Sequence, residues 1–535
     1  MPDRVEMPVA DAALRVKNFD EVALGYTPEM AAIEASRCLG CKNPLCVQGC
    51  PVSVDIPGFI ECLKQQDVAG AYAAIRKTNC LPAVCGRVCP QEEQCERNCV
   101  LGRKGQPVAI GRLERYVADH LAQGCWDASC EKIPCTTTGE SPCGCAVTAP
   151  CGCAAASETP CGHAPEAGQS AAAADQCACG GPSSQNACAP AQNGCGCATS
   201  AQTSCAASQN PSSGKKVAVI GSGPAGLSTA GELASRGYSV TLFEALHSPG
   251  GVLSYGIPAF RLPKDIVQRE ISLLRTMGVD IVCNAVIGKS LTIDELTADG
   301  YAAIFIGSGA GLPRFMGIEG EFLNGVLSAN EFLTRVNLME AHRPDSQTPV
   351  LAARNVAVVG GGNVAMDAAR CALRLGAETV SIVYRRSLAE MPARAEEVHH
   401  AEEEGVRMLC LTNPVKLCGE ARVSHMHCQK MQLGEPDSSG RAQAVAIPDS
   451  LFELPADMVI MAVGTSPNPL LAQTTPGLLT DRRGCLVVQE SVKTSRPSVY
   501  AGGDAVTGAA TVIQAMGAGR RAAMEIDAEL SALPR

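Results

Sequence analysis

The stretch Val217-Ala218-Val219-Ile220-Gly221-Ser222-Gly223-Pro224-Ala225-Gly226 decides the fold of this 535-residue chain. Its apolar half predicts a buried strand. Its three glycines permit a tight turn that brings the backbone close to a phosphate at the start of the next helix. Ser239 to Glu244 is the next predicted strand, and Glu244 stands near the usual distance for an acid that binds ribose hydroxyls. A structural turn with coincidental glycines leaves Glu244 unexplained, so the stretch predicts a dinucleotide site.

A second turn of the same kind follows the predicted strand Asn355 to Val359, with Gly360, Gly362 and Ala365 at equivalent spacing. The strand after it, Val380 to Tyr384, leads into Arg385 and Arg386 instead of ending in an acid. Arginine suits a 2′-phosphate that a carboxylate would repel, so this unit favours NADP(H) over NAD(H). A solvated basic turn is the alternative interpretation of the two arginines.

Short apolar strands alternate with helical patterns after Lys215 and return late in the chain, at Met458 to Gly464 and Val499 to Gly502. This alternation predicts an α/β fold with parallel, doubly wound sheets, and the two strand–glycine–helix units suggest an internal duplication of the Rossmann kind. The late segment Tyr500-Ala501-Gly502-Gly503-Asp504 precedes a helix of small residues. There the backbone can approach a ring system, and Asp504 can hydrogen-bond a sugar-like chain.

Ten of the 30 cysteines stand in the first hundred residues, seven of them in the runs Cys38-x2-Cys41-x4-Cys46-x3-Cys50-Pro51 and Cys89-x5-Cys95-x3-Cys99. Closely spaced cysteines with a proline after the last are typical of iron–sulfur ligation. Zinc sites usually use two close cysteine pairs, and disulfide frameworks belong to small secreted chains. Thr27 and Pro28 predict the start of a helix that ends near Cys38 and delivers the first ligands. Cys62, Cys80 and Cys85 are read as ordinary buried cysteines.

Residues 133–214 differ in composition from the rest, since they contain no lysine, arginine or aromatic residue. Such a segment cannot bury enough apolar surface to offset its ordering entropy, so it is predicted to be a disordered insert. Fourteen cysteines lie between Cys125 and Cys205. Their spacing could bind soft metal ions, and a low-complexity expansion without function is the alternative.

The overall composition excludes several classes of function. A net charge of −10 gives no reason to expect nucleic acid or an anionic membrane as partner. No run of 18 apolar residues is present, and the first 17 residues lack an export signal. We therefore expect a cytoplasmic protein without membrane insertion.

Taken together, the motifs resemble the family of the glutamate synthase small subunit. That family includes the large subunit of the NADH-dependent ferredoxin:NADP⁺ oxidoreductase and is similar to the N-terminal half of dihydropyrimidine dehydrogenase. The resemblance covers residues 12–130 and 215–530. Besides the late Ala501-Gly502-Gly503-Asp504, its marks are Ser36-Arg37-Cys38-Leu39-Gly40-Cys41, Gly250-Gly251-Val252-Leu253-Ser254-Tyr255-Gly256-Ile257-Pro258, and Tyr384-Arg385-Arg386 with Glu390-Met391-Pro392-Ala393. The insert departs from the family, whose members have a short linker there.

The resemblance implies FAD at the first glycine turn and the Gly-Asp segment, NADPH at the second turn, and two [4Fe-4S] clusters. One cluster would take Cys38, Cys41, Cys46 and Cys99, and the other would take Cys50, Cys89, Cys95 and Glu114. The expected nucleotide-binding residues are Gly221, Gly223, Pro224, Ala225, Gly226, Glu244, Gly251, Gly360, Gly362, Asn363, Ala365, Arg385, Arg386, Gly503, Asp504 and Thr511. Hydride transfer to a flavin needs no side-chain acid–base pair, so no catalytic residue is assigned.

The expected domains are a helical iron–sulfur domain (1–132), the insert (133–214), an FAD domain in two parts (215–345 and 466–535) and an NADPH domain (346–465). The expected function is electron transfer between NADP(H), FAD and the clusters, within a glutamate synthase whose large chain makes glutamate from glutamine and 2-oxoglutarate. One alternative is the large subunit of a bifurcating NADH-dependent ferredoxin:NADP⁺ oxidoreductase, with a small flavoprotein subunit or ferredoxin as partner. Another is a metal-binding or redox-sensing protein that works through the insert.

Overall fold

The computed structural model describes residues 2–125, 214–436, 440–489 and 491–532. Apart from Gly214, the predicted insert lies outside the described residues, and so do its cysteines. The N-terminal part is helical, as predicted. Its elements are α1 (Ala12–Arg15), α2 (Pro28–Ser36), α3 (Leu45–Gln48), α4 (Ile56–Lys64), α5 (Val68–Arg76), α6 (Pro82–Val88), α7 (Ile110–Cys125) and the 3-10 turns η1 (Gln91–Glu93) and η2 (Val100–Arg103).

The helix predicted before the first cysteines is confirmed as α2. The hydroxyl of Thr27 accepts a hydrogen bond from the backbone N–H of Met30 at 3.3 Å, and Pro28 occupies the first helical position. The helix ends at Ser36, so Cys38 follows its last turn directly.

The first sheet contains seven strands in the order β15 (Val488–Gln489), β16 (Lys493–Thr494), β17 (Val499–Ala501), β4 (Tyr301–Ile306), β1 (Lys216–Ile220), β2 (Ser239–Phe243) and β3 (Asp280–Val282). The pairs from β17 to β3 are parallel, and the two edge strands β15 and β16 are antiparallel. Because β17 pairs with β4, the C-terminal part of the chain completes the sheet that the first glycine turn begins.

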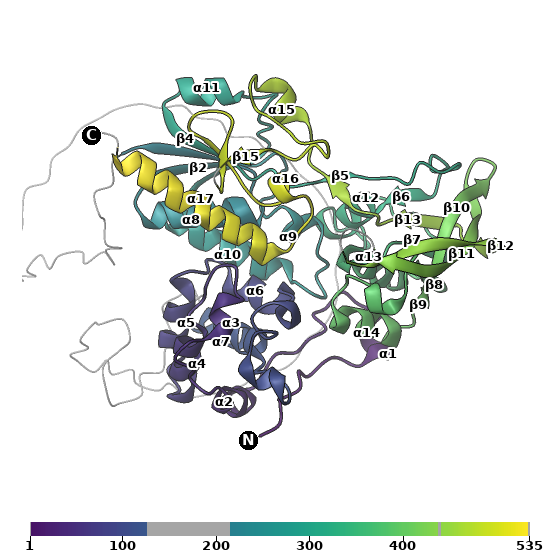
Figure 1. Cartoon of the computed structure of the whole chain (residues 1–535), viewed down its shortest axis with the longest axis horizontal. Helices are drawn as coiled ribbons and strands as arrows, with labels where there is room; N and C mark the ends of the chain where they lie inside the picture. Colours follow the sequence, from purple (N-terminus) through teal and green to yellow (C-terminus); the bar gives the residue numbers. More distant parts are fainter. Residues whose placement is uncertain (1, 126–213, 437–439, 490, 533–535) are drawn as a thin grey trace, which may run out of the picture. The chain divides into compact units, whose positions relative to one another are not determined.

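Helices accompany this sheet, and two of them pack unusually closely. The helices are α8 (Pro224–Ser235), α9 (Val252–Tyr255), α10 (Lys264–Thr276), α11 (Ile293–Ala298), α15 (Leu470–Thr474), α16 (Asp504–Thr507) and α17 (Val512–Ala532). The long helix α17 runs alongside α8 (Figure 1). A Cβ atom at Gly519 would lie 2.2 Å from the carbonyl oxygen of Ala225, so only glycine permits this approach.

The second sheet has the parallel order β6 (Val326–Ser328), β13 (Met458–Met461), β7 (Asn355–Val359), β8 (Thr379–Val383) and β9 (Arg407–Leu409). Its helical elements are α12 (Ala329–Leu333), the π-helical turn η3 (Thr334–Leu338), α13 (Asn363–Arg374), η4 (Leu388–Glu390) and α14 (Ala395–Glu403). Both sheets repeat the strand–glycine–helix plan, which confirms the predicted α/β class. Because β6 pairs within the second sheet, that sheet also draws on residues before position 346.

A third, antiparallel sheet was not predicted from the sequence. It consists of β10 (Thr412–Gly419), β11 (Val423–Pro436) and β12 (Ala442–Pro455). The three strands are drawn in green at the right of Figure 1. A two-stranded pairing of β5 (Leu312–Pro313) with β14 (Thr465–Ser466) joins the segments that lead into and out of the second nucleotide-binding unit.

Candidate functional site

The first glycine turn is a close-packed backbone cradle between β1 and α8. Gly221 has φ of 95°, and a Cβ atom there would lie 2.5 Å from the carbonyl oxygen of Gly307. A Cβ atom at Gly226 would lie 1.9 Å from the carbonyl oxygen of Gly221. At Gly223 the added atom meets nothing within 4 Å, so the middle of the turn borders open space at the start of α8. This geometry fits a pyrophosphate held by backbone amides.

Glu244 lies at the end of β2, buried beside this turn. Its carboxylate accepts hydrogen bonds from the backbone N–H of Ser222 at 2.9 Å, from the Ser222 hydroxyl and from the backbone N–H of Leu246 at 2.8 Å. The Ser222 hydroxyl in turn accepts from the backbone N–H of Gly250 at 2.8 Å. Ser222 and Gly250 were not among the expected binding residues, although a hydroxyl residue inside the glycine turn was a signal for the first.

The C-terminal Gly-Asp segment meets the same turn. A Cβ atom at Gly503, where φ is 67°, would lie 2.9 Å from the Cβ of Ala225. Asp504 accepts one hydrogen bond from the backbone N–H of Ala510 at 3.2 Å, and burial raises its pKa to about 6. A half-buried carboxyl with one described hydrogen-bond donor fits the hydroxyls of a flavin side chain. Thr511 instead caps α17, since its hydroxyl accepts from the backbone N–H of Gln514 at 3.3 Å.

Gly251 connects the first turn with the following loop. Its φ is 54°, and a Cβ atom there would lie 2.8 Å from the Cα of Gly223. The structure therefore brings together the predicted residues of the first turn, Pro224 and Ala225 at the start of α8, Gly251 and the Gly-Asp segment, which come from distant parts of the sequence.

The second glycine turn repeats this arrangement between β7 and α13. A Cβ atom at Gly360 would lie 2.4 Å from the carbonyl oxygen of Ala462, whereas one at Gly362 meets nothing within 4 Å. The Asn363 side chain accepts a hydrogen bond from the backbone N–H of Arg394 at 2.9 Å. Ala365 is fully buried in the first turns of α13.

The two predicted phosphate-binding arginines have different environments. Arg385 is exposed just after β8. Arg386 is buried, and its Nε donates to the carbonyl oxygen of Ala442 at 2.7 Å, at the start of β12. Arg385 is therefore the better placed of the two to meet a bound phosphate.

The first predicted ligand set converges on one cavity. Cys38, Cys41, Cys46 and Cys99 all line it, together with apolar residues from η2 and α4. Burial raises the pKa of the Cys46 thiol to about 11, and the neighbouring Cys99 and Cys38 thiols add to the rise. Thiols that oppose one another's ionisation in this way would be relieved by a bound cation, so the set fits a cluster.

The residues of the second predicted ligand set, Cys50, Cys89, Cys95 and Glu114, also lie close to one another. Burial raises the pKa of Cys50 to about 11, and Glu114 contributes to the rise. The pKa of the Cys95 thiol is raised well above its ordinary value, first by burial and then by the neighbouring Glu96, Cys50 and Glu114. A hydrogen bond with Cys85 acts to lower the pKa of Cys89, but burial, Glu114, Cys95 and Cys50 outweigh it. The three thiols and the carboxylate are thus mutual neighbours.

The packing of α6 against α7 explains how Glu114 reaches the cysteines. A Cβ atom at Gly86 would lie 2.6 Å from the backbone nitrogen of Arg115, so the two helices touch at this glycine. Burial raises the pKa of Glu114 to about 7, and its only described hydrogen bond comes from Asn79 Nδ2 at 2.7 Å. Asn79 escaped the sequence analysis because nothing in its local sequence marks it.

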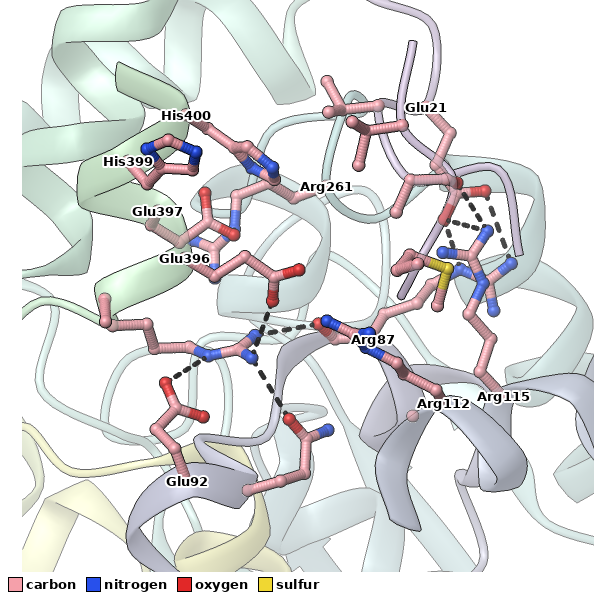
Figure 2. A pocket seen from close by; sticks show the side chains of 18 of the residues that line it. Glu21, Arg87, Glu92, Arg112, Arg115, Arg261, Glu396, Glu397, His399 and His400 are labelled. Atoms are coloured by element: carbon pink, nitrogen blue, oxygen red, sulfur yellow. Dashed lines mark hydrogen bonds and ion pairs between the residues drawn. The ribbon is translucent and has the colours of Figure 1, made fainter. Parts of the chain in front are cut away.

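A cavity of about 520 Å³ lies between the N-terminal part and the second nucleotide-binding unit (Figure 2). None of the predicted nucleotide-binding residues or cysteines lines it. Its charges are largely paired: Arg394 contacts Glu92 at 3.1 Å, and Arg87 contacts Glu21 at 2.7 Å. We call it the charged cavity. It marks a polar contact between two parts of the chain.

Two family models match the chain. One, described as dihydropyrimidine dehydrogenase domain II, 4Fe-4S cluster, matches residues 15–126, and the pyridine nucleotide-disulphide oxidoreductase model matches residues 215–519. The fold and its sites thus define an NADPH-dependent flavin oxidoreductase with an attached 4Fe-4S domain.

Comparison with named relatives shows which family within this class of oxidoreductases the chain belongs to. The beta subunit of an NADP(+)-dependent formate dehydrogenase from Moorella thermoacetica is 40% identical over 90% of this chain, which spans 59% of that protein. The glutamate synthase (NADPH) small chain of Halomonas elongata is 32% identical over 96% of this chain and 93% of its own length. The corresponding small chain of Escherichia coli is 30% identical over 97% and 96%. The chain belongs to the glutamate synthase small-chain family.

A solved structure supports the fold of the nucleotide-binding part. Mycobacterium tuberculosis FprA in complex with NADPH aligns with a TM-score of 0.50 and 21% identity, over 60% of this chain and 87% of that one. Within the described ranges, no helix is both long and apolar enough to cross a membrane.

Proposed function

We propose that this chain carries electrons between NADP(H) and a partner subunit, by way of FAD and two [4Fe-4S] clusters. When bound, the flavin and clusters supply the conversion of a two-electron hydride into single electrons, and the protein sets their positions. In this proposal the first glycine turn, Glu244 and Asp504 hold FAD, and the second turn with Arg385 holds NADP(H).

The observation that carries the proposal is the direct packing of the second cysteine set against α17, the helix that follows the Gly-Asp segment. A Cβ atom at Gly517 would lie 2.7 Å from the carbonyl oxygen of Pro51, the residue after Cys50. Cys85 Sγ lies 3.5 Å from Met516 Sδ, and Gln94 Nε2 lies 3.5 Å from Thr511 Oγ1. Residues next to the proposed cluster ligands therefore adjoin the proposed flavin site, which supports single-electron transfer between the two.

As partner we propose a glutamate synthase large chain, which would make glutamate from glutamine and 2-oxoglutarate with these electrons. Support comes from the two small chains that match almost end to end. A second candidate is a different redox partner, because a formate dehydrogenase beta subunit is 40% identical. A bifurcating complex with a small flavoprotein subunit or ferredoxin belongs to this second candidate.

Anaerobic affinity purification of the full chain from its native cells, followed by identification of the co-purifying protein, tests the partner. A large chain bearing a glutaminase, together with NADPH-dependent glutamate formation, supports the first candidate. A formate dehydrogenase or a small flavoprotein in its place supports the second. NADPH oxidation by the purified chain with an artificial dye tests the electron path separately, and its absence from flavin- and iron-loaded protein would overturn the proposal.

A further inference from the structure

A cysteine and two histidines meet on the outer face of the third sheet, and none of them belongs to the sites described above. Cys418 pairs with His425 across β10 and β11, and His427 follows two residues later on the same strand. Successive residues of a strand point to opposite faces. Leu417 and Met426 lie on the inner face, buried in the core, so the cysteine and the histidines share the other face and are half-buried there.

The distances among these three side chains suit a small metal ion. One potential ligand atom from each residue lies within 4.8 Å of the others, and the two imidazole centroids are 5.5 Å apart. Zinc binds thiolate at about 2.3 Å and imidazole nitrogen at about 2.0–2.1 Å in tetrahedral sites, which places neighbouring ligand atoms roughly 3.3–3.6 Å apart. Small side-chain rotations would bring the ligand atoms, now within 4.8 Å of one another, to these shorter separations.

The surroundings supply what a histidine-based metal site usually contains. The Ser424 hydroxyl lies 3.0 Å from Nδ1 of His425, which fixes the ring and leaves its Nε2 as a ligand atom. Glu453 on β12 pairs with His427, and its Oε1 lies 3.4 Å from Nε2 of that ring. The Glu453 side chain is 70% exposed and can turn toward a shared ion.

We propose that Cys418, His425 and His427 bind a zinc-class divalent ion, with the Glu453 carboxylate as fourth ligand. One sulfur, two imidazoles and a carboxylate form a donor set that zinc accepts, and binding releases the thiol proton to solvent. The ion would join β10 to β11 next to their connecting turn and tie both strands to β12. This site is independent of the proposed electron path.

The test uses the full chain with its flavin and iron in place, and ¹¹³Cd²⁺ and Zn²⁺ as probes. The ¹¹³Cd resonance of a site with one sulfur and two nitrogens lies well away from that of all-thiolate sites, which separates it from ions bound by the many other cysteines. We expect this mixed-ligand resonance in the wild type and its loss in Cys418→Ser and in His427→Gln. We also expect the zinc affinity of this site, measured by competition with a chromophoric chelator, to fall about 100-fold or more.

His399→Gln is the matched control. His399 is exposed and contacts Glu403 at 3.3 Å, as His427 contacts Glu453, and its surroundings contribute no thiol. This variant should keep the mixed-ligand resonance and the zinc affinity. The proposal is overturned if the wild type gives no such resonance, or if the resonance survives in Cys418→Ser. Flavin content and far-UV circular dichroism check that each variant is folded.

Discussion

Glu114 is the residue whose proposed role differs most from what its type suggests, because a carboxylate would replace the fourth cysteine of a cluster. We expect Glu114→Ala to lower the iron content to about half that of the wild type, since one of the two proposed clusters loses a proposed ligand. Iron assay and electron paramagnetic resonance of the reduced, anaerobically reconstituted protein would measure the loss.

Glu270→Ala is the control for this change. Glu270 is a buried carboxyl on α10 whose pKa burial also raises to about 7, but it accepts a hydrogen bond from the backbone N–H of Ala83 at 3.0 Å and is no proposed cluster ligand. Its removal should leave the iron content unchanged. Equal iron in the Glu114→Ala variant and the wild type would contradict the ligand assignment.

Arg385 is expected to decide between the two nicotinamide nucleotides. A charge-assisted hydrogen bond to a phosphate is worth about 1.5–3 kcal/mol. Arg385→Ala should therefore raise the KM for NADPH about 10- to 100-fold and leave the KM for NADH nearly unchanged, measured with an artificial dye. Arg354→Ala, which removes an exposed arginine paired with Glu378, should alter neither value. Equal losses with both nucleotides would argue against a 2′-phosphate contact.

Among the elements, the β1–turn–α8 unit allows a test of flavin binding apart from folding. Two glycine-to-alanine substitutions in this unit should affect one property each. A methyl group at Gly223 fits the fold, since φ is −68° and nothing lies within 4 Å, but it fills the space proposed for the pyrophosphate. Gly223→Ala should keep the unfolding temperature of the flavin-free protein and lose bound flavin. Gly226→Ala places its methyl group against the turn itself and should destabilise the flavin-free protein by about 1–3 kcal/mol.

Flavin content after gel filtration and thermal unfolding of the flavin-free proteins would distinguish the two variants. Full flavin content in Gly223→Ala would contradict the proposed binding mode. For Gly362, where the backbone also leaves open space in the turn proposed for NADP(H), the KM for NADPH takes the place of flavin content.

In the molecule as a whole, the iron–sulfur helices and the N-terminal segment contact the nucleotide-binding units through different kinds of interaction, one apolar and one ionic. The iron–sulfur helices and the first sheet share one continuous apolar core, which includes Ile60, Leu113 and Leu227. The N-terminal segment reaches the second unit through two ion pairs of Arg15, which is buried: it contacts the exposed Glu403 at 2.7 Å and the buried Glu404 at 2.9 Å. Glu404 also pairs with Arg370 and Arg374.

This cluster of charges predicts an acid-sensitive attachment. Burial acts to raise the pKa of Glu404, but hydrogen bonds from Arg370 and Arg374 lower it from 4.5 to about 2. The folded-state pKa is depressed, so the stabilisation is complete above pH 4.5 and is lost as the pH falls toward 2. Hydrogen exchange at the backbone N–H of Ala10, which is bonded to Val22, should accelerate over that range beyond the intrinsic pH effect.

Arg15→Met should also accelerate exchange at Ala10 at neutral pH, because it removes both ion pairs of this segment. Glu404 keeps its pairs with Arg370 and Arg374, so the buried carboxylate is not left unpaired. Arg343→Ala, which breaks an exposed pair with Glu340, should leave exchange at Ala10 unchanged. Unaltered exchange in Arg15→Met would show that the apolar contacts of this segment hold it without the ion pairs.

Much of the fold followed from the chain alone, because its signals are local. The strands before both glycine turns, the helix capped by Thr27 and the alternation of strands with helices each depend on neighbouring residues. The third sheet was not predicted, although His425 and His427 alternate with Met426 and Cys428 as in a half-buried strand. The alternation is short, because no residue of β11 after Cys428 is buried. The pairing of β6 with β13 escaped as well, because a three-residue strand has too little pattern.

For the sites, the chain's own residues already indicated glycines where a Cβ atom has no room and cysteines in close groups, because those features lie within a few neighbouring positions. The family resemblance implied that Asp504 joins the first turn and that Glu114 joins Cys50, Cys89 and Cys95, and the packing shows how these segments meet. The meeting of Cys418 with two histidines came from the three-dimensional structure alone. Each combination arises from the packing of helices or the register of strands, and packing depends on contacts between residues far apart along the chain.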